Sequence, residues 1–405
     1  MNEKPFQPGI DQVSYSKPVF GEQEINAVTK ALQAGWLAPG KLSAEFEQKM
    51  SQLFGKKHGL FVNSGTSANF VAVTSAGLPA GSEVITQACT FPATLSPILV
   101  AGLVPVFIDS VPGTYNIDVS QLEAAISDKT KAIFISHALG NINDMAKIRE
   151  LCDKYKLLFI DDSCDAIGST YKGRSPSKWS DITTTSFYAS HHITAGGGGG
   201  MVFTDNDDLA KSARIMRDWG RDFDFDDEKN LSKRFDLNIE GIDFDRAFYY
   251  LQMCYNLKPV EMQAAFGLVQ LERLAEFNQT RREVFAKLYK FFQQYENYFI
   301  LPESLPDADV SWLYFPLTIK ADAPFVRKDL MLYLEENKIQ TRPVFTGNIL
   351  RQPAYKNIPH RVSGTLNNAD FMMSNSFMIG CHHALTDEII DYMTSVFVDF
   401  ISKNA

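Results

Sequence analysis

The sequence predicts an α/β fold in which a doubly wound, mostly parallel sheet of seven strands is flanked by helices and followed by a smaller α+β domain. Two observations support this prediction. Short apolar segments recur between residues 58 and 204, and helix-like stretches separate most of them. Strands that alternate with helices indicate a parallel sheet covered on both faces.

The predicted strands are short apolar runs, and the helices between them carry mixed apolar and polar residues. The seven strands are His58–Asn63, Glu83–Thr90, Pro105–Asp109, Ala132–His137, Leu157–Asp162, Thr183–Tyr188 and Gly200–Thr204. Helical patterns cover Gly21–Ala34, Ser67–Ala76, Val119–Ala125 and Asn143–Tyr155.

The pattern weakens in the charged and aromatic stretch 219–255, which we interpret as a surface excursion at an edge or a subunit contact. A long helical pattern, 259–295, follows it. Apolar runs at 312–319 and 339–344 and helices near 326–336 and 387–402 indicate the smaller domain. We therefore predict an N-terminal arm, 1–17, a large domain, 18–258, and a linking helix with a small domain, 259–405.

Composition excludes several classes of protein. The 405 residues carry a net charge of -9 with dispersed Lys and Arg, so nucleic acid is not the expected partner. The longest near-apolar run, 97–108, falls short of the ~20 residues that a membrane span needs, and no signal region precedes it, so a cytoplasmic protein is expected. The five cysteines form no CxxC pair, which favours reduced thiols and gives no zinc motif.

The most unusual stretch is 186–201, SFYASHHITAGGGGGM. It joins a strand end to His191, His192 and five consecutive glycines, which would let the backbone approach a ligand closely. A surface hairpin with incidental histidines is the alternative. Ligands of doubly wound sheets bind beyond the carboxyl ends of the strands, where SGT, TFPAT, DDSCDA and SFYASHH would all lie.

Each of these clusters has a possible role in binding. In NSGTSAN, the backbone N–H groups of Gly65, Thr66 and Ser67 would open a helix and suit a phosphate, although Ser and Thr are also routine helix caps. Asp162 and Asp165 follow a strand, where a carboxylate can hold a proton on a heterocyclic nitrogen; a helix cap or surface carboxylate is the alternative.

Phe91 follows another strand and could stack on a planar ring, although a single Phe is more often part of the core. A phosphate cradle, a pyridinium partner, a stacking ring and a base together indicate a pyridoxal phosphate site.

Five motifs in this order carry a family resemblance: SGTSA, TFPAT, IDDSCDA, SFYASHHIT with its glycines, and YNLKPVEMQAA. From about residue 17 to its C-terminus, the chain resembles the DegT/DnrJ/EryC1/StrS family of nucleotide-sugar aminotransferases, which implies a type I aspartate aminotransferase-like fold. The resemblance also implies roles for individual residues. Gly65, Thr66, Ser67 and Ser186 would hold the cofactor phosphate, Phe91 would stack on the ring, Asp162 would bind the pyridine nitrogen, and Asn256 would reach the phosphate of the neighbouring subunit of a homodimer with shared sites.

The main departure is His191, which stands where the aminotransferases have the lysine that bonds covalently to the cofactor. This substitution, and Asp165 in place of a common amide, resemble the branch of 4-keto-6-deoxy nucleotide-sugar 3-dehydratases. That branch implies C3 dehydration with pyridoxamine 5'-phosphate, His191 as the base and Asp162 keeping the ring nitrogen protonated. The substrate would be GDP- or CDP-linked, and L-glutamate would restore the amine from pyridoxal 5'-phosphate.

One style of this branch holds an iron–sulfur cluster on four cysteines. Cys164 matches one of them, but Phe223, Phe225 and Leu231 stand at the others, and a single thiolate cannot hold such a cluster. No iron–sulfur cluster is therefore expected, and Cys164 itself reads as a small buried residue.

Other readings stay open: a dehydrase that needs a separate reductase, another sugar-nucleotide enzyme, or a non-catalytic, regulatory cofactor-binding protein. Arg221, Arg342 and Arg351 could each bind a diphosphate or a glutamate carboxylate, or pair on the surface. A second pair, His382 and His383, reads as structural.

Overall fold

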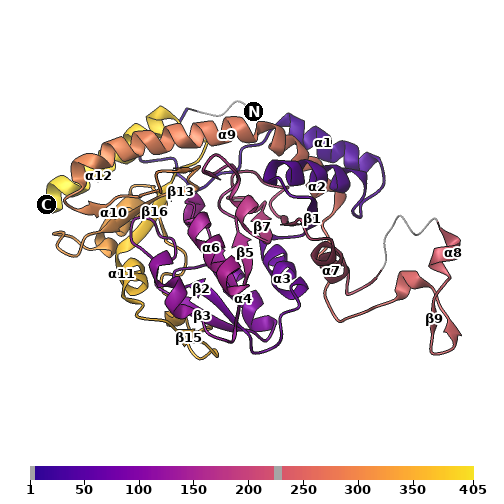
Figure 1. The fold of residues 1–405 in the computed structure, drawn as a ribbon. Coiled ribbons are helices and arrows are strands. Elements are labelled where there is room, and N and C mark those ends of the chain that lie inside the picture. Colours follow the sequence, from indigo (N-terminus) through magenta and orange to yellow (C-terminus); the bar gives the residue numbers. More distant parts are fainter. Residues whose placement is uncertain (1–4, 223–229) are drawn as a thin grey trace.

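A computed structural model describes residues 5–222 and 230–405 (Figure 1). Its largest sheet has eight strands in the order β1-β8-β7-β5-β4-β2-β3-β15. Their bounds are β1 His58–Val62, β2 Glu83–Gln87, β3 Val104–Ile108, β4 Thr130–Ser136, β5 Leu158–Asp162, β7 Ile182–Ser186, β8 Gly200–Thr204 and β15 Arg361–Val362. The predicted mostly parallel sheet is confirmed: β15, β3, β2, β4, β5 and β7 run parallel, and β8 pairs antiparallel with both β7 and β1.

Helices cover both faces of this sheet because its strands are apolar on both sides. In β4, Phe134 packs in one cluster with Val71 of α3 (Gly65–Ser75) and Leu95 of α4 (Pro92–Val100). Its neighbour Ile133 packs in another cluster with Ile148 of α6 (Met145–Tyr155). Successive residues of a strand point to opposite faces, so the continuous apolar runs of the sequence correspond to strands buried on both sides.

The remaining helices of the first half pack around these layers. They are α1 Glu22–Gln33, α2 Lys41–Phe54, the short α5 Leu122–Ala125, and α7 Asp207–Arg217. Of these and the preceding helices, α2, α4 and α7 are not among the helices predicted from the sequence.

The helix α9, Glu261–Phe292, runs along the top of the molecule in Figure 1. Beyond it lies an antiparallel sheet in the order β11-β13-β16-β14, formed by β11 Phe299–Ile300, β13 Tyr314–Ile319, β16 Ser376–Gly380 and β14 Arg342–Pro343. The helices α10 Arg327–Glu336, α11 Asn367–Asn375 and α12 Asp387–Asn404 accompany it. A separate apolar cluster, with Phe292, Phe315 and Phe397 at its centre, joins α9, β13 and α12.

Two features cross between the predicted domains. Val13 of the N-terminal arm exchanges backbone hydrogen bonds with Lys338 and Gln340 beyond α10. The two-residue strand β15 pairs with β3, so the large sheet gains an eighth strand from the C-terminal part of the chain. This strand was not expected because its two residues, Arg361 and Val362, form no apolar run. The domain boundaries after residues 17 and 258 stay a prediction.

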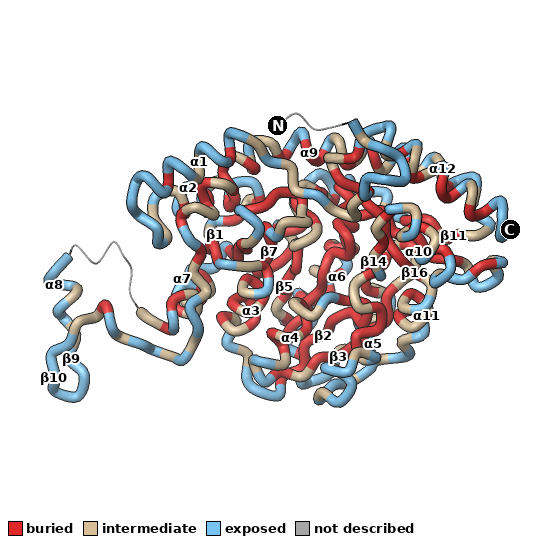
Figure 2. Tube along the Cα trace, turned by 180° about the vertical axis from the view of Figure 1, so that it is seen from behind, coloured by how far each residue is buried: buried red, intermediate tan, exposed pale blue. Residues whose placement is uncertain are grey.

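The stretch around residues 230–255 stands away from the rest of the protein (Figures 1 and 2). It contains the one-turn helix α8, Leu231–Arg234, and the small hairpin of β9, Asn238–Ile239, and β10, Ile242–Asp243. It is the predicted surface excursion. Residues 223–229, including Phe223 and Phe225, lie outside the described residues. No helix of the described ranges is both long and apolar enough to cross a membrane.

Candidate functional site

The predicted site residues follow neighbouring strands at one edge of the large sheet. Asp162 ends β5 and Ser186 ends β7, and these two strands are adjacent and parallel. The helix α3 begins at Gly65 just after β1, and α4 begins at Pro92 just after β2. This edge is where doubly wound sheets bind ligands.

Asp162 is buried and its carboxylate is fixed from three elements. Asn69 Nδ2 of α3 and Thr94 Oγ1 of α4 donate to Oδ2 at 2.7 and 2.8 Å. The backbone N–H of Cys164 donates to Oδ1 at 3.1 Å. Asp162 is therefore neither a helix cap nor a surface carboxylate, and its orientation is set by the surrounding structure.

The amino end of α3 forms a tight cradle. A Cβ atom added to Gly65 would lie 2.5 Å from Ser186 Cβ, and one added to Gly200 would lie 2.4 Å from the Ser64 carbonyl oxygen. Glycine at these two positions lets β7, β8 and α3 come together. Ser64 caps the helix by accepting from the Ser67 N–H at 3.1 Å, so the capping alternative holds for Ser64.

The cradle nevertheless retains the features of an anion site. The first N–H groups of a helix have no partner inside the helix, which leaves those of Gly65 and Thr66 for a ligand. Thr66 is exposed and Ser186 is buried with its Oγ beside Gly65. The Ser67 hydroxyl donates to Asn63 Oδ1 at 2.6 Å.

Phe91 is not part of the core. It stands at the start of α4 with 54% of its surface exposed, and its ring centroid lies 6.4 Å from that of Phe345. Thr94, one helical turn further on, bonds to Asp162, so the Phe91 ring and the Asp162 carboxylate belong to the same site. An exposed aromatic ring there is available for stacking on a planar ligand.

His191 and Asp165 lie side by side. His191 Nε2 is 3.4 Å from Asp165 Oδ1, and each side chain keeps 14% exposure. His191 Nδ1 lies 3.3 Å from the Ser186 carbonyl oxygen. Burial lowers the pKa of His191 to about 4, opposed by this hydrogen bond and assisted by the nearby Arg281 cation. The imidazole is thus neutral, and able to accept a proton, at pH 7.

Asp165 shows the opposite shift. Burial, together with the negative charge of Asp162, raises the pKa of Asp165 to about 7, although the backbone N–H of Leu139 donates to it. Leu139 adopts a left-handed backbone (φ 56) in the turn after β4. Three adjacent strand ends, those of β4, β5 and β7, therefore converge on the pair.

His192 points the other way, into the protein. It is fully buried, and its Nε2 lies 2.8 Å from the Ser311 carbonyl oxygen. Of the two histidines in the SHHIT motif, only His191 reaches the partly exposed site. His382 Nε2 bonds to the Ser14 carbonyl and His383 stacks on Phe277, which fits the structural role predicted for that pair.

Arg281 of α9 lies behind His191 and is 1% exposed. Its Nη1 donates to the carbonyls of Leu313 and Cys381 at 3.0 and 2.8 Å, and its Nη2 to that of His191 at 3.5 Å. This buried cation ties the His191 loop to the C-terminal part of the chain.

The remaining predicted residues lie further out. Asn256 is exposed and its backbone forms an isolated β-bridge with Asp218. Its side-chain Oδ1 accepts a hydrogen bond from the Lys258 N–H at 3.2 Å. Arg351 forms a bidentate ion pair with Asp370. Arg221 pairs with Asp218.

Arg342 differs from the other two arginines, since it has no carboxylate partner within the described ranges. Its guanidinium lies 4.3 Å from the centre of the Tyr15 ring, which in turn lies 5.6 Å from that of Tyr314. Tyr314 bonds to Ser190 in the His191 loop, and its pKa is raised by burial and by Asp165. Arg342 is thus connected to the site through two aromatic rings.

Sequence reasoning did not assign Thr94, Asn69, Tyr314 or Arg281. Asn69 and Thr94 lie inside the quoted motifs, at helical spacing from Gly65 and Phe91, and this spacing is the signal that places them on the site. Arg281 lies in the run Gln-Thr-Arg-Arg-Glu, which has the composition of a solvated helix face. No signal in that run distinguishes the buried arginine from its exposed neighbours.

The cysteines are all free thiols. Cys164 lies beneath Gly65, since a Cβ on that glycine would be 3.2 Å from its Sγ, and burial raises its pKa well above the ordinary value. Within residues 5–222 and 230–405, no group of three or more His, Cys, Asp or Glu side chains has the arrangement of a metal site.

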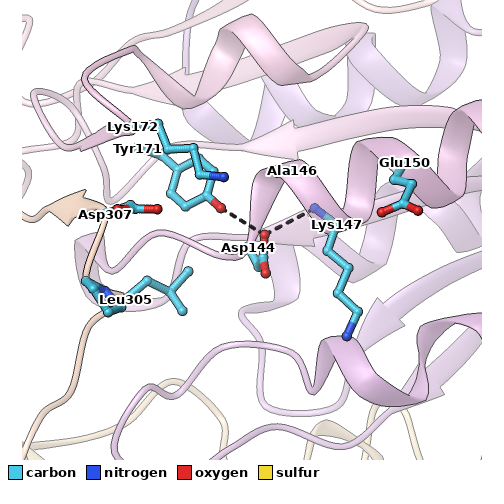
Figure 3. Close-up of a pocket in the computed structure, with 9 residues that line it drawn as sticks. Asp144, Ala146, Lys147, Glu150, Tyr171, Lys172, Leu305 and Asp307 are labelled. Atoms are coloured by element: carbon cyan, nitrogen blue, oxygen red, sulfur yellow. Dashed lines mark hydrogen bonds between the residues drawn. The ribbon is translucent and has the colours of Figure 1, made fainter.

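A separate open groove lies beside the start of α6 (Figure 3). Its lining includes Asp144, Lys147, Tyr171, Leu305 and Asp307. Asp144 Oδ1 accepts from Tyr171 Oη at 2.9 Å and from the Lys147 N–H at 3.1 Å. None of the predicted site residues lines this groove, so it is separate from the candidate site.

Comparison with known proteins gives a consistent result. Residues 18–397 match the model of the DegT/DnrJ/EryC1/StrS aminotransferase family. The chain is 41% identical to the lipopolysaccharide biosynthesis protein RfbH of Salmonella typhimurium, over 100% of this chain and 95% of the relative. It is 36% identical to the dTDP-4-dehydro-2,6-dideoxy-D-glucose 3-dehydratase of Saccharopolyspora spinosa, over 99% and 89%.

A solved structure shares the fold closely. The crystal structure of GDP-4-keto-6-deoxymannose-3-dehydratase with a trapped PLP-glutamate geminal diamine superposes with a TM-score of 0.86 at 25% identity. The alignment covers 95% of this chain and 99% of the other. The predicted aminotransferase-like fold is confirmed.

Proposed function

The chain belongs to the DegT/DnrJ/EryC1/StrS aminotransferase family, and we propose that it is a 3-dehydratase of a 4-keto-6-deoxy nucleotide sugar. The observation that carries this proposal is His191. A partly exposed, neutral imidazole stands beside Asp165 where the aminotransferases have a lysine. This side chain can accept a proton but cannot tether a cofactor covalently.

The site fits pyridoxamine 5'-phosphate and its pyridoxal form. The N–H groups of Gly65 and Thr66 with the Ser186 hydroxyl would hold the phosphate, and the Ser67 hydroxyl would join them by exchanging its bond to Asn63 Oδ1 for one to the phosphate. Phe91 would stack on the ring. Asp162, held by Asn69, Thr94 and the Cys164 N–H, would bind the pyridine nitrogen. When bound, the cofactor supplies a ring that takes up negative charge as the sugar reacts.

The chain's own residues perform the proton transfers. Asp162 presents a fixed carboxylate, which would hold the proton on the ring nitrogen of the bound cofactor. His191 accepts a proton at Nε2, because its Nδ1 is turned to the Ser186 carbonyl. Arg281 holds the His191 backbone from behind, which fixes the imidazole relative to the sheet edge.

Two small molecules complete the proposal. A nucleotide sugar would need a cation for its diphosphate, and Arg342 is the candidate because it is connected to the site and is not in an ion pair with any described carboxylate. L-Glutamate would restore the amine form of the cofactor. The candidate nucleotides are GDP and CDP, and also dTDP because of the 36% identical relative.

We also propose that a second copy of the chain completes the site. The projecting stretch, 230–255, exposes large apolar side chains, including Phe235, Ile242, Phe248 and the fully exposed Met253. Exposed apolar surface of this kind favours a partner, and Asn256 follows it directly, beside Leu257, whose carbonyl accepts from the Asn63 N–H. A homodimer in which these stretches cover each other's sites would bury this surface.

Sedimentation tests the dimer. Met253→Asp combined with Phe248→Asp is expected to convert dimer to monomer, whereas Val398→Asp, on the exposed face of α12, should leave the dimer intact. A wild-type protein that sediments as a monomer would contradict this part of the proposal.

The reaction is tested by incubating the protein anaerobically with pyridoxal phosphate, excess glutamate and GDP-, CDP- or dTDP-linked 4-keto-6-deoxy sugars. We expect 2-oxoglutarate, ammonia and a sugar that has lost one oxygen, without any added reductase. Absolute dependence on a reductase would favour the reductase-coupled reaction. Amino transfer to the sugar, or no 2-oxoglutarate at all, would contradict the proposal.

A further inference from the structure

The position of the proton on His191 follows from its hydrogen bonds. Nδ1 lies 3.3 Å from the Ser186 carbonyl oxygen, which can only accept. In a neutral imidazole one nitrogen carries the proton and the other a lone pair. Nδ1 is therefore the protonated nitrogen, and Nε2 presents its lone pair to Asp165 Oδ1, 3.4 Å away.

Asp165 can interact favourably with this lone pair only as a carboxylic acid, because an ionised carboxylate has no proton to donate. Two features favour the acid. Its neighbour Asp162 is three residues away and sits at the end of β5, and its negative charge opposes a second one. The side chain is also desolvated, and its pKa is raised to about 7 for these two reasons.

The other groups that face the pair add no charge that would favour a protonated His191. Arg281 from α9 disfavours a charged His191, and it also disfavours a charged His192. Tyr314 from β13 and Cys164 after β5 have pKa values raised above their ordinary ones, so both are neutral. Tyr188 lies against His191, with ring centroids 6.1 Å apart. The mobile proton of the pair is thus held by Asp165 rather than His191.

We propose that Asp165 and His191 form an acid–base pair that shares one proton, with Asp165 as the donor to the departing C3 hydroxyl and His191 Nε2 as the acceptor. This inference deepens the proposed dehydration and rests on it for the identity of the leaving group. It assigns Asp165 a role in proton transfer beyond cofactor binding.

The proton balance of such a pair is closed. Asp165 gives its proton to the hydroxyl oxygen, the carbon–oxygen bond breaks and water leaves. Nε2 is thereby released from its hydrogen bond and would accept the proton that the C4′ carbon of the bound cofactor loses in the same elimination. That proton then passes from Nε2 to the Asp165 carboxylate, which restores the starting state. The loss of water needs no outside oxidant or reductant, because the two electrons that the deoxygenated sugar gains would come from the amine form of the cofactor, which L-glutamate would restore by its own oxidation to 2-oxoglutarate.

The 14% exposure of each side chain leaves both groups within reach of a bound sugar. The separation of 3.4 Å is long for a hydrogen bond, as is common for catalytic pairs before substrate binds. Contraction of the pair on binding would bring the donor and acceptor to transfer distance.

The protonation state is tested first in the free protein, so that this result does not depend on any reaction. Nitrogen-15 NMR of histidine side chains, with His191→Gln to identify the resonances, should show Nδ1 protonated and Nε2 unprotonated. The nitrogen-15 chemical shift of Nε2 should also change in one titration step near pH 7, as Asp165 ionises. Asp165→Asn should abolish this step, while Asp322→Asn, an exposed carboxylate elsewhere, should retain it. An Nε2–H form, or a step that persists in Asp165→Asn, would overturn the pair.

The donor role is tested by turnover. Wild-type kcat should fall as pH rises above about 7. The Asp165→Asn variant should have a kcat about 100-fold lower, and its kcat should not decline further above pH 7. Asp165→Glu, which keeps a carboxylic acid, should recover part of the rate and should again show the decline of kcat at high pH. Unchanged kcat in Asp165→Asn would overturn the donor role. A wild-type protein that turns over no 4-keto sugar would instead contradict the proposed function, while the NMR result would still decide whether the pair exists.

Discussion

Asn69 and Asp162 are joined by a hydrogen bond of 2.7 Å from Asn69 Nδ2 to Asp162 Oδ2. The same amide donates to the Ala93 carbonyl at 3.1 Å, and its oxygen accepts from Thr184 Oγ1 at 2.5 Å. A single side chain thus ties α3 to α4, to β5 and to β7. The carboxylate is held in place before any ligand binds, which reduces the ordering cost of binding.

Replacing Asp162 should weaken cofactor binding. A hydrogen bond to a charged group contributes about 1.5–3 kcal/mol, so Asp162→Ala should lower the affinity for pyridoxal phosphate by roughly 10- to 150-fold in a spectroscopic titration. Thr94→Val keeps the Asp162 carboxylate and should lower the affinity for pyridoxal phosphate less than Asp162→Ala does. Equal affinity in Asp162→Ala and wild type would contradict the placement of the ring nitrogen.

The cradle at α3 gives a second prediction. Gly65→Ala would force a Cβ to within 2.5 Å of Ser186 Cβ, and overpacking of this kind costs about 1–3 kcal/mol. We expect a lower melting temperature and weaker binding of pyridoxal phosphate and of inorganic phosphate. Gly21→Ala is the matched control, because no atom lies within 4 Å of its added Cβ. If both variants bind phosphate as the wild type does, the cradle is not the phosphate site.

The sequence predicts the strands of this fold better than their ends. Glu83–Thr90 was expected as a strand, yet β2 stops at Gln87, because Cys89 and Thr90 turn toward Asn348 and Thr346 of the C-terminal part. Such contacts depend on residues some 250 positions away and leave no periodic signal. The helix α4 was not singled out because its residues, PATLSPILV, are apolar nearly all round and include an internal proline.

The site shows the same limit. That Asp162, Ser186 and His191 lie near one another could be predicted, because they stand at or just beyond the carboxyl ends of predicted strands and parallel strands place these ends together. Their individual roles came only from the family resemblance. The pairing of His191 with Asp165 also follows, in outline, from the adjacency of β5 and β7. The burial of Arg281 could not be predicted, since it depends on the carbonyls of Leu313 and Cys381, which lie 32 and 100 residues further along the chain.

Stability should fall in acid because of the buried histidines. The pKa values of His191 and His382 are lowered to about 4, that of His383 to about 2, and that of His192 well below its ordinary value, chiefly by burial. Below pH 6.5 the unfolded chain binds protons at these groups and the folded chain does not, so stability is lost as pH falls from about 6.5 toward 4.

Asp165 opposes this trend, because its raised pKa makes the folded state bind a proton between about pH 4 and 7. Near pH 5 the unfolded chain therefore binds up to three more protons at these groups than the folded chain, four at the histidines less one at Asp165. The free energy of unfolding should then fall by up to about 4 kcal/mol for each pH unit that the pH is lowered. Urea unfolding of the free protein at pH 8, 6.5 and 5.5 measures this slope. His383→Leu, which removes one of the four groups, should make it shallower; equal stability at pH 6.5 and 5.5 would show that these histidines are charged in the folded state.

The placement of His191 can be tested by restoring the aminotransferase residue. His191→Lys would put a primary amine beside Asp165 in the loop after β7, within reach of the aldehyde of pyridoxal phosphate if the ring lies on Phe91. We expect visible absorbance that dialysis does not remove, whereas wild-type protein should release the cofactor. His192→Lys is the matched control, because His192 is fully buried and turned toward Ser311, so a lysine there should acquire no lasting absorbance. A His191→Lys protein that stays colourless, while it still folds as the wild type does by circular dichroism, would mean that the cofactor binds elsewhere. That outcome would also remove the basis for assigning His191 as the base.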